Sequence, residues 1–367
     1  MSTQITDIEF VYNKKIKRVK LNVDLNSIKN FDEENNIQIY ILNNDASENI
    51  DIFHSYGKKV IGIYHGAYLS SIFTNKENNF HAFENFQKLD SLVHFIPDDY
   101  WVYKKLGFNN TIFLPIPYIF DPKYTQESPL INKNILLVGG IDILKGVKYG
   151  IKAMSKILKQ HPDAKLTILG LSPPQDIVDL IKKLKIEDSV SFPGFSNNIT
   201  EFYLNTSVLI ATSISESFPF IINEAKAHAI PIVAFNIDYS PWYQSGVITV
   251  NMFDYHSMAS EVIALLSDYD YRKDKGREAK LSFNNFLNNE QITKIWDRFF
   301  HYLIYNNQDF KTFQKEVEDK YYNEILAKRH LYKHFSYAQK FNKYFRCHSF
   351  EDLTSLKYIN NIEACPT

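Results

Sequence analysis

From residue 134 onward, short apolar runs alternate with segments of helical periodicity, and this alternation constrains the fold more than any other feature of the chain. Residues 134–138, 165–169 and 207–211 are largely apolar runs typical of buried strands, and helical periodicity follows each of them. Such alternation predicts a parallel sheet with helices on both faces. Because ligands of these sheets bind at the carboxyl ends of the strands, we expect the functional residues directly after them. Further strands are predicted at 189–192, 232–235 and 247–250, and helices at 220–229 and 255–267.

The first 125 residues carry the same signals in a weaker form. Runs rich in Ile, Val, Tyr and Phe predict strands at 37–42, 60–64, 91–96 and 111–114, and residues 99–106 predict a helix. Three prolines at 115, 117 and 122 precede a polar stretch over 123–133, which indicates an interdomain linker.

The pattern divides the chain into four parts. Residues 1–125 and 134–287 are each expected to form a Rossmann-like α/β domain. A long helix is expected over residues 288–309, and a helical tail rich in basic and aromatic residues over 310–367.

Composition excludes several classes of protein. The net charge is −1, so a nucleic-acid partner is not expected. No apolar run approaches ~18 residues and the N-terminus lacks a basic start, so neither a membrane span nor a secretory signal is expected. Cys347 and Cys365 offer neither a disulfide framework nor metal-ligand spacing, and we therefore expect a cytoplasmic location.

A glycine turn follows the strand at 134–138. Gly139 and Gly140 allow the backbone to approach a ligand closely, and the next helix presents free N–H groups that can bind an anion. Lys145 stands where that helix is expected to begin and adds a charge suited to phosphate. A tight turn with a surface lysine explains the same residues equally well.

Two glutamates stand eight residues apart after the strand at 207–211. Glu216 is expected on the loop and Glu224 more than one turn into a helix that begins near Pro219. Carboxylates placed in this way can accept hydrogen bonds from hydroxyls on two parts of one ligand. The same spacing is also common on solvated helices.

The segment SESFPFIINEAKAHAIPIVAF resembles the E-x7-E signature of retaining GT-B glycosyltransferases of family 4. The resemblance extends over about residues 134–246 and includes the glycine turn, Lys145 and the strand KLTILG. It implies a GT-B fold, in which two Rossmann-like domains with parallel sheets face a cleft. The first domain would bind the acceptor, the second would bind a nucleotide-sugar donor, and residues 288–309 would cross back to the first domain.

The resemblance also implies roles for single residues. Glu216 would contact the transferred sugar, Glu224 the ribose hydroxyls and Lys145 the diphosphate. Backbone groups of Ser217, Phe218, Pro219 and Phe220, together with the turn at Gly139 and Gly140, would complete the donor site.

His65 is the best candidate in the first domain. It follows the strand at 60–64, and family 4 enzymes have a histidine at this place that contacts the reacting sugar. The first domain taken alone favours a different interpretation, in which His65 is a structural histidine whose hydrogen bonds are made within the core.

Three departures separate the chain from the family pattern. Gly140 stands where the family usually has an arginine, so one of two diphosphate cations is absent. Ala229 replaces a glycine near the end of the helix at 220–229. No glycine precedes Gly57, so the usual glycine-rich loop after the first strand is absent from the N-terminal half.

Two further motifs have competing explanations. Asp268-Tyr269-Asp270 matches a metal-binding D-x-D pattern, but it lies at the end of a predicted helix, and no metal site is expected. Residues 320–346 combine seven Lys and Arg with interleaved aromatic residues. This segment is interpreted either as a peripheral contact with an anionic membrane or as a solvated or oligomer-forming helix.

The resemblance therefore implies a metal-independent, retaining glycosyltransferase that transfers a hexose-type unit without a cofactor. UDP is preferred to GDP as the nucleotide of the donor. The acceptor is expected to be a glycan or a lipid-linked glycan. Two alternatives stay open: a non-catalytic GT-B-like subunit or glycan-binding scaffold, and another sugar-nucleotide enzyme such as an epimerase. The oligomeric state is not predicted.

Overall fold

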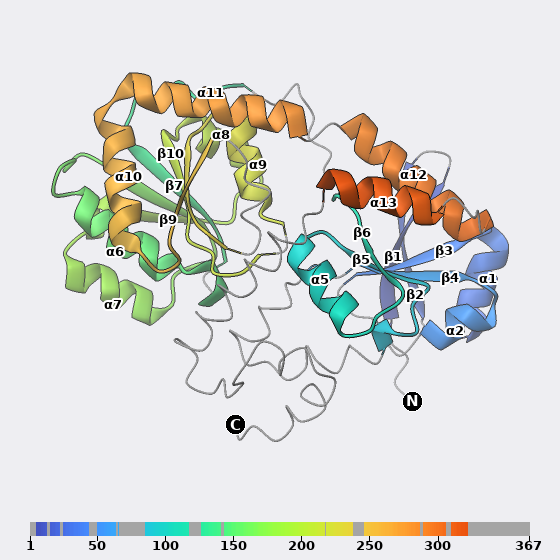
Figure 1. Cartoon of the computed structure of the whole chain (residues 1–367). Helices are drawn as coiled ribbons and strands as arrows, with labels where there is room; N and C mark the ends of the chain where they lie inside the picture. The colour runs from blue at the N-terminus through green and yellow to red at the C-terminus, as the bar shows by residue number, and fades with distance from the viewer. Residues whose placement is uncertain are drawn as a thin grey trace.

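A computed structural model shows two α/β lobes joined by long helices that run along one side (Figure 1). The structure describes residues 5–12, 15–22, 25–43, 50–63, 65, 85–116, 126–140, 143–216, 218–237, 246–286, 289–305 and 310–321.

The first lobe is built on a four-stranded parallel sheet in the order β3-β4-β5-β6. Its strands are β3 (Ile39–Asn43), β4 (Lys59–Ile63), β5 (Ser91–His94) and β6 (Thr111–Phe113). Every residue of β5 and β6 is buried, which agrees with their apolar runs. Among the described residues of this lobe, the helices are α1 (Leu25–Asn35), α2 (Ile50–Ser55) and α5 (Pro97–Lys105).

An antiparallel hairpin precedes this sheet. β1 (Ile5–Tyr12) and β2 (Lys15–Asn22) pair with each other as a separate two-stranded sheet. The sequence analysis does not predict either strand, because it rests on continuous apolar runs. In the β2 sequence KIKRVKLN each apolar residue instead stands singly between polar residues, so β2 contains no apolar run.

The second lobe contains a six-stranded parallel sheet in the order β12-β11-β10-β7-β8-β9. The chain enters at β7, builds outward through β8 and β9, then returns to pair β10 with the other side of β7. The direction of building therefore reverses between β7 and β10, which is where open α/β sheets bind ligands. The strands are β7 (Asn134–Gly139), β8 (Lys165–Gly170), β9 (Val190–Gly194), β10 (Val208–Ala211), β11 (Ile232–Phe235) and β12 (Val247–Val250).

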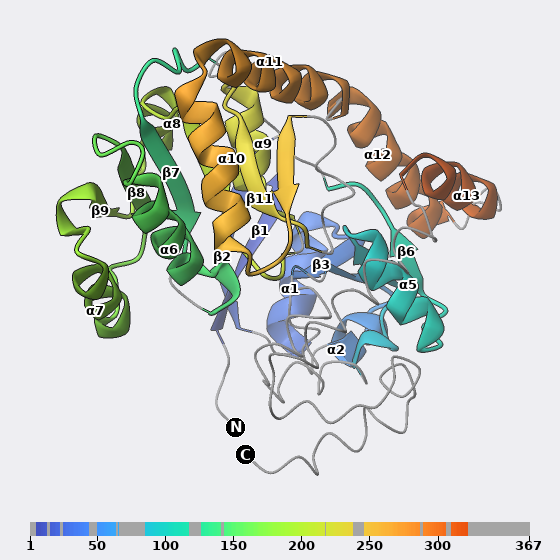
Figure 2. The ribbon, with the colours of Figure 1, turned by 60° about the vertical axis from the view of Figure 1, so that its left-hand side comes forward.

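Helices connect these strands and cover the sheet (Figure 2). They are the 3₁₀ helices η2 (Ile143–Lys145) and η3 (Glu187–Ser189), and the α-helices α6 (Val147–Ile157), α7 (Gln175–Leu184), α8 (Ile199–Leu204), α9 (Phe220–Ala227), α10 (Tyr255–Ser267) and α11 (Tyr269–Phe286). The sequence analysis does not predict α11, because its many charged residues and Gly276 obscure the helical pattern.

Two C-terminal helices follow the second lobe in sequence but lie beside the first (Figures 1 and 2). They are α12 (Asn289–Tyr305) and α13 (Phe310–Tyr321). The indole nitrogen of Trp296 in α12 donates to the carbonyl oxygen of Pro115, 2.8 Å away and just beyond β6. α13 packs against β6, and Tyr100 of α5 donates its hydroxyl to Glu318. The structure thus confirms the two-domain α/β fold with parallel sheets.

Close contact between α11 and the end of α9 predicts a stability effect at Gly276. A Cβ atom at this position would lie 2.2 Å from the backbone oxygen of Ala229. Gly276→Ala should therefore lower the free energy of unfolding by about 1–3 kcal/mol, the usual range for overpacking, although alanine favours helix formation. Urea unfolding of the purified chain measures this change.

Gly150 in α6 is the matched control. A Cβ atom there would lie 2.8 Å from Cδ1 of Leu137, the end of a side chain that can move. Gly150→Ala should be close to neutral. Equal effects of the two substitutions would contradict the proposed role of the α9–α11 contact.

Candidate functional site

The carboxyl ends of β7 and β10 lie next to each other in the second sheet. β10 pairs with β7 in parallel, with Val208 opposite Ile135 and Leu209 opposite Leu136. The glycine turn after β7 and the glutamate loop after β10 therefore leave the same edge of the sheet. This register brings together predicted site residues that are far apart in sequence.

Backbone and side-chain hydrogen bonds hold the two segments in place. The amide of Ile214 donates to the carbonyl oxygen of Leu144 at 2.7 Å, and the hydroxyl of Thr212 donates to that of Lys145 at 2.8 Å. Gly146 adopts a left-handed φ of 59°, and a Cβ atom there would lie 2.2 Å from the backbone oxygen of Thr212. Only glycine therefore fits at the start of α6.

Lys145 and Glu216 form an ion pair at this edge. The ammonium group of Lys145 donates to Oε1 of Glu216, and the aliphatic part of the lysine lies over Gly139. The side chains are 30% and 12% exposed, so the pair is only partly screened by water. The structure thus places Lys145, which is predicted to bind the diphosphate, beside Glu216, which is predicted to contact the sugar. Gly140 is also described, whereas residues 141 and 142 lie outside the described residues.

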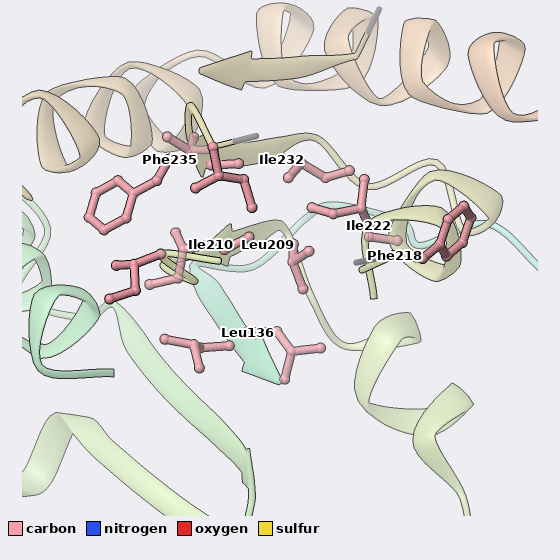
Figure 3. Close-up of a cluster of buried hydrophobic side chains, with 14 of the residues drawn as sticks. Leu136, Leu209, Ile210, Phe218, Ile222, Ile232 and Phe235 are labelled. Atoms are coloured by element: carbon pink, nitrogen blue, oxygen red, sulfur yellow. The ribbon is translucent and has the colours of Figure 1, made fainter. Parts of the chain in front are cut away.

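The residues after Glu216 differ in their surroundings. Ser217 lies outside the described residues. The Phe218 side chain is buried and lies beside Ile222 in the apolar cluster of the second lobe (Figure 3). Pro219 precedes the first turn of α9, and Phe220 is 41% exposed. A role of Phe218 in binding would therefore have to come from its backbone, since its ring belongs to the core.

Glu224 is the fifth residue of α9 and has a partner of its own. The hydroxyl of Tyr203 in α8 donates to Oε2 of Glu224 at 2.6 Å. Partial burial raises the pKa of Glu224, and the hydrogen bond from Tyr203 opposes that rise. Glu224 is therefore a half-buried carboxylate that keeps one oxygen in a charge-assisted hydrogen bond.

The two helices that begin at the site offer backbone donors. Within the described part of the chain, no side chain caps the first turn of α6 or of α9. Uncapped first turns leave amide groups and the positive end of the helix dipole for an anionic ligand. This arrangement suits the phosphates of a nucleotide.

His65 lies in the first lobe, directly after β4. Its Nε2 is 3.0 Å from Oδ1 of Asn43, the last residue of β3, and its ring centre is 5.7 Å from that of Phe95. Both contacts belong to the first lobe, whereas Lys145, Glu216 and Glu224 belong to the second. The structure therefore gathers the donor-site candidates in one lobe and places His65 at the strand ends of the other.

The D-x-D motif has a structural explanation. Oδ1 of Asp268 accepts the amide of Tyr271 at 2.9 Å, which caps the start of α11. Among the residues that the structure describes, no group of three or more His, Cys, Asp or Glu side chains is arranged to hold a metal ion.

The basic segment 320–346 lies almost wholly outside the described residues, which end at Tyr321. None of the described helices is both long enough and apolar enough to span a membrane.

Sequence reasoning missed three residues that shape the site. Tyr203, Thr212 and Asn43 position Glu224, Lys145 and His65, respectively. Thr212 follows a predicted strand, so the rule that functional residues lie directly after strands could have found it. The pairing of Tyr203 with Glu224 has no signal in the sequence, because it depends on how α8 and α9 pack.

Comparison with known proteins supports a glycosyltransferase. Residues 125–282 match the family model described as Glycosyl transferases group 1. Over 134 residues the chain is 36% identical to a protein of Haemophilus influenzae named an uncharacterized glycosyltransferase, a match that covers 36% of this chain and 38% of that protein. The chain thus spans well under half of the curated relative that it matches.

Solved structures show the same fold. Sucrose-phosphate synthase from Thermosynechococcus elongatus has a TM-score of 0.65 at 16% identity, and the match covers 77% of this chain and 78% of that chain. HepE of Anabaena, in complex with UDP and glucose, has a TM-score of 0.64 at 15% identity, with 75% and 80% covered. At these identities the likeness shows the fold alone, and that fold is GT-B.

The environment of Glu224 predicts a pH-dependent stability. Because burial raises the pKa of its carboxyl in the folded chain, ionised Glu224 destabilises the fold at neutral pH, and this effect disappears as the pH falls below that pKa. Glu224→Gln should raise the melting temperature at pH 7.5. The rise should shrink toward zero as the pH is lowered to about 4, near the unperturbed pKa of a glutamate.

Thermal unfolding between pH 4 and pH 8 measures this difference. Glu187→Gln in η3 is the control, because it removes one negative charge from an exposed position. A lower melting temperature for Glu224→Gln at neutral pH would show that the ionised carboxylate stabilises the fold instead.

Proposed function

We propose that the chain is a cytoplasmic, metal-independent, retaining glycosyltransferase that uses a nucleotide-diphosphate sugar, with UDP preferred to GDP. The observation that carries this proposal is the joint placement of Lys145, Glu216 and the uncapped starts of α6 and α9 at one sheet edge. The group 1 match spans these residues, and a solved neighbour of the same fold holds UDP and glucose.

The proposed chemistry breaks the bond between the sugar and the diphosphate. Negative charge develops on the leaving diphosphate, and Lys145 with the helix N–H groups would stabilise it. A new bond to an acceptor oxygen forms on the same face of the sugar, and the acceptor proton passes to the leaving diphosphate. Glu216 and His65 would position the sugar, and Glu224 would accept the ribose hydroxyls.

In the structure, Lys145 and Glu216 are paired with each other. Each charge is satisfied by the other before a donor arrives. A diphosphate that takes Lys145 would release Glu216 to accept hydroxyl groups of the sugar. Donor binding and the alignment of Glu216 would then be one event.

The acceptor side of the proposal rests on the first lobe. His65 and Asn43 lie at the strand ends where an acceptor or the transferred sugar would be met. A glycan or lipid-linked acceptor fits a cytoplasmic enzyme, and the basic segment 320–346 would supply contact with an anionic membrane face.

A non-catalytic scaffold is the alternative favoured by one observation. Gly140 stands where the family usually carries an arginine, so the turn supplies no second side-chain cation to a diphosphate. The retained pairing of Lys145 with Glu216 argues for catalysis, because a scaffold has no need of it.

Release of nucleotide diphosphate tests the proposal. The full chain is incubated with UDP-glucose, UDP-N-acetylglucosamine or GDP-mannose, and free UDP or GDP is measured. Lys145→Ala and Glu216→Ala should each lower the release by about 100-fold or more, as expected for loss of a group that contacts the reacting centre. Lys182→Ala, at an exposed position in the last turn of α7, is the control.

The alternatives give different results in the same assay. Absence of nucleotide binding by calorimetry at millimolar donor would reject the transferase and favour the scaffold. Conversion of the donor to an isomeric sugar without transfer to any acceptor would indicate an epimerase.

If Glu216 and the diphosphate compete for Lys145, Glu216→Gln should strengthen the binding of UDP although it lowers activity. UDP lacks the sugar that Glu216 would contact, so Glu216→Gln removes only the anion that competes for Lys145. This variant should bind UDP about 3–10-fold more tightly, while its release of UDP from the donor falls. Calorimetry with UDP measures the affinity, and unchanged or weaker binding would contradict the exchange of partners by Lys145.

A further inference from the structure

Tyr203 is buried behind the half-exposed carboxylate of Glu224. Only 1% of Tyr203 is exposed, and its hydroxyl donates to Oε2 of Glu224 at 2.6 Å. A short hydrogen bond to an ionised acceptor is stronger than one between neutral groups, and it fixes direction as well as distance. The hydroxyl therefore determines where one oxygen of Glu224 lies.

The ring of Tyr203 is itself fixed from the other side. It stacks on the imidazole of His228 with ring centres 5.2 Å apart and planes 18° apart. Nδ1 of His228 lies 2.6 Å from the carbonyl oxygen of Gln126, and the amide of Ser128 donates to the carbonyl oxygen of His228 at 2.9 Å. Tyr203 is thus held in place by its own helix, α8, and, through His228, by the residues that precede β7.

We propose that Tyr203 is a positioning residue for nucleotide recognition, because its hydroxyl holds Oε2 of Glu224 and leaves Oε1 to accept the ribose hydroxyls. This inference rests on the proposed function, in which Glu224 binds the ribose. Tyr203 does not touch the ligand, and it acts only through the carboxylate.

The positioning role predicts a loss of discrimination as well as of affinity. Glu224 can favour a ribose over a 2′-deoxyribose only if its free oxygen is held toward the 2′-hydroxyl. A carboxylate released from Tyr203 can turn toward water, so it gains less from that hydroxyl. A general loosening of the core would instead weaken the binding of the ribonucleotide and of its 2′-deoxy form equally.

The experiment titrates the full-length chain with UDP and GDP and with their 2′-deoxy analogues by calorimetry. Tyr203→Phe removes the hydroxyl and keeps the ring that stacks on His228. We expect it to bind the better ribonucleotide about tenfold more weakly and to lose most of the preference over the deoxy form. The ratio of the two affinities does not depend on the fraction of folded chain, so partial unfolding cannot imitate this result.

A pH profile supplies an independent readout. The Tyr203 hydrogen bond opposes the rise that burial causes in the pKa of Glu224. Its removal should shift the acid-side loss of nucleotide binding to higher pH. Other titratable groups lie on or next to α9 and on α11, the helix packed against it. Lys226 donates to Ser282, and Nδ1 of His228 lies against the carbonyl oxygen of Gln126. On α11, Lys280 donates to the carbonyl oxygen of Ala227 and pairs with Glu127 at 3.9 Å, while Lys275 pairs with Glu278 and Arg277 with Asp274.

Tyr271→Phe is the matched control, since this half-buried tyrosine lies on α11 and packs near Lys275. It should leave affinity, discrimination and pH profile unchanged. If the wild type binds UDP or GDP with discrimination and Tyr203→Phe does the same, the inference is overturned and the proposed function stands. If the wild type binds neither nucleotide, the proposed function is overturned and the inference with it.

Discussion

The parallel pairing of β7 with β10 is the constraint on which the site depends. Because β7 is the first strand of its lobe and β10 the fourth, their pairing reverses the direction in which the sheet is built. The loops after the two strands therefore leave the same edge instead of being separated by β8 and β9. The ion pair between Lys145 and Glu216 and the approach of Gly146 to Thr212 both follow from this one register.

All three charged candidates of the second lobe have internal partners in the structure. Lys145 has Glu216, and Glu224 has Tyr203. A half-buried charge without a partner would destabilise the fold, so a binding site of this kind needs substitutes for its ligand. The two partners differ, because Glu216 lies on the loop after β10 and keeps some exposure to water, whereas Tyr203 is buried.

Most of the fold could be predicted from the sequence, and less of the site. Strand and helix patterns are local, so the runs at β7, β10 and β11 are found within one or two residues. The loops that carry Lys145 and Glu216 follow from the rule that ligands bind at strand ends. Apolar runs do not reveal the rest. In β2 single apolar residues stand between polar ones, α11 is rich in charged residues, and the Tyr203–Glu224 pair depends on a contact between two helices.

Ala229 shows how structure explains a departure seen in the sequence. The family that the sequence resembles usually has glycine at this position, and Ala229 adopts a left-handed φ of 55°. The conformation costs an alanine roughly 1–2 kcal/mol compared with the right-handed region. The fold therefore keeps the turn at the end of α9 and tolerates the strain. The same turn places the carbonyl oxygen of Ala229 against Gly276, so α11 is fitted to it.

The return of α12 to the first lobe has a mechanical consequence. The chain passes between the lobes twice, once after Ile116 and again after Phe286, and Trp296 fastens the second crossing to Pro115 at the start of the first. The hydrogen bond between Trp296 and Pro115 therefore holds the residues that begin one crossing beside the helix that follows the other. The two lobes are joined on the side where α12 lies against the first lobe (Figure 1).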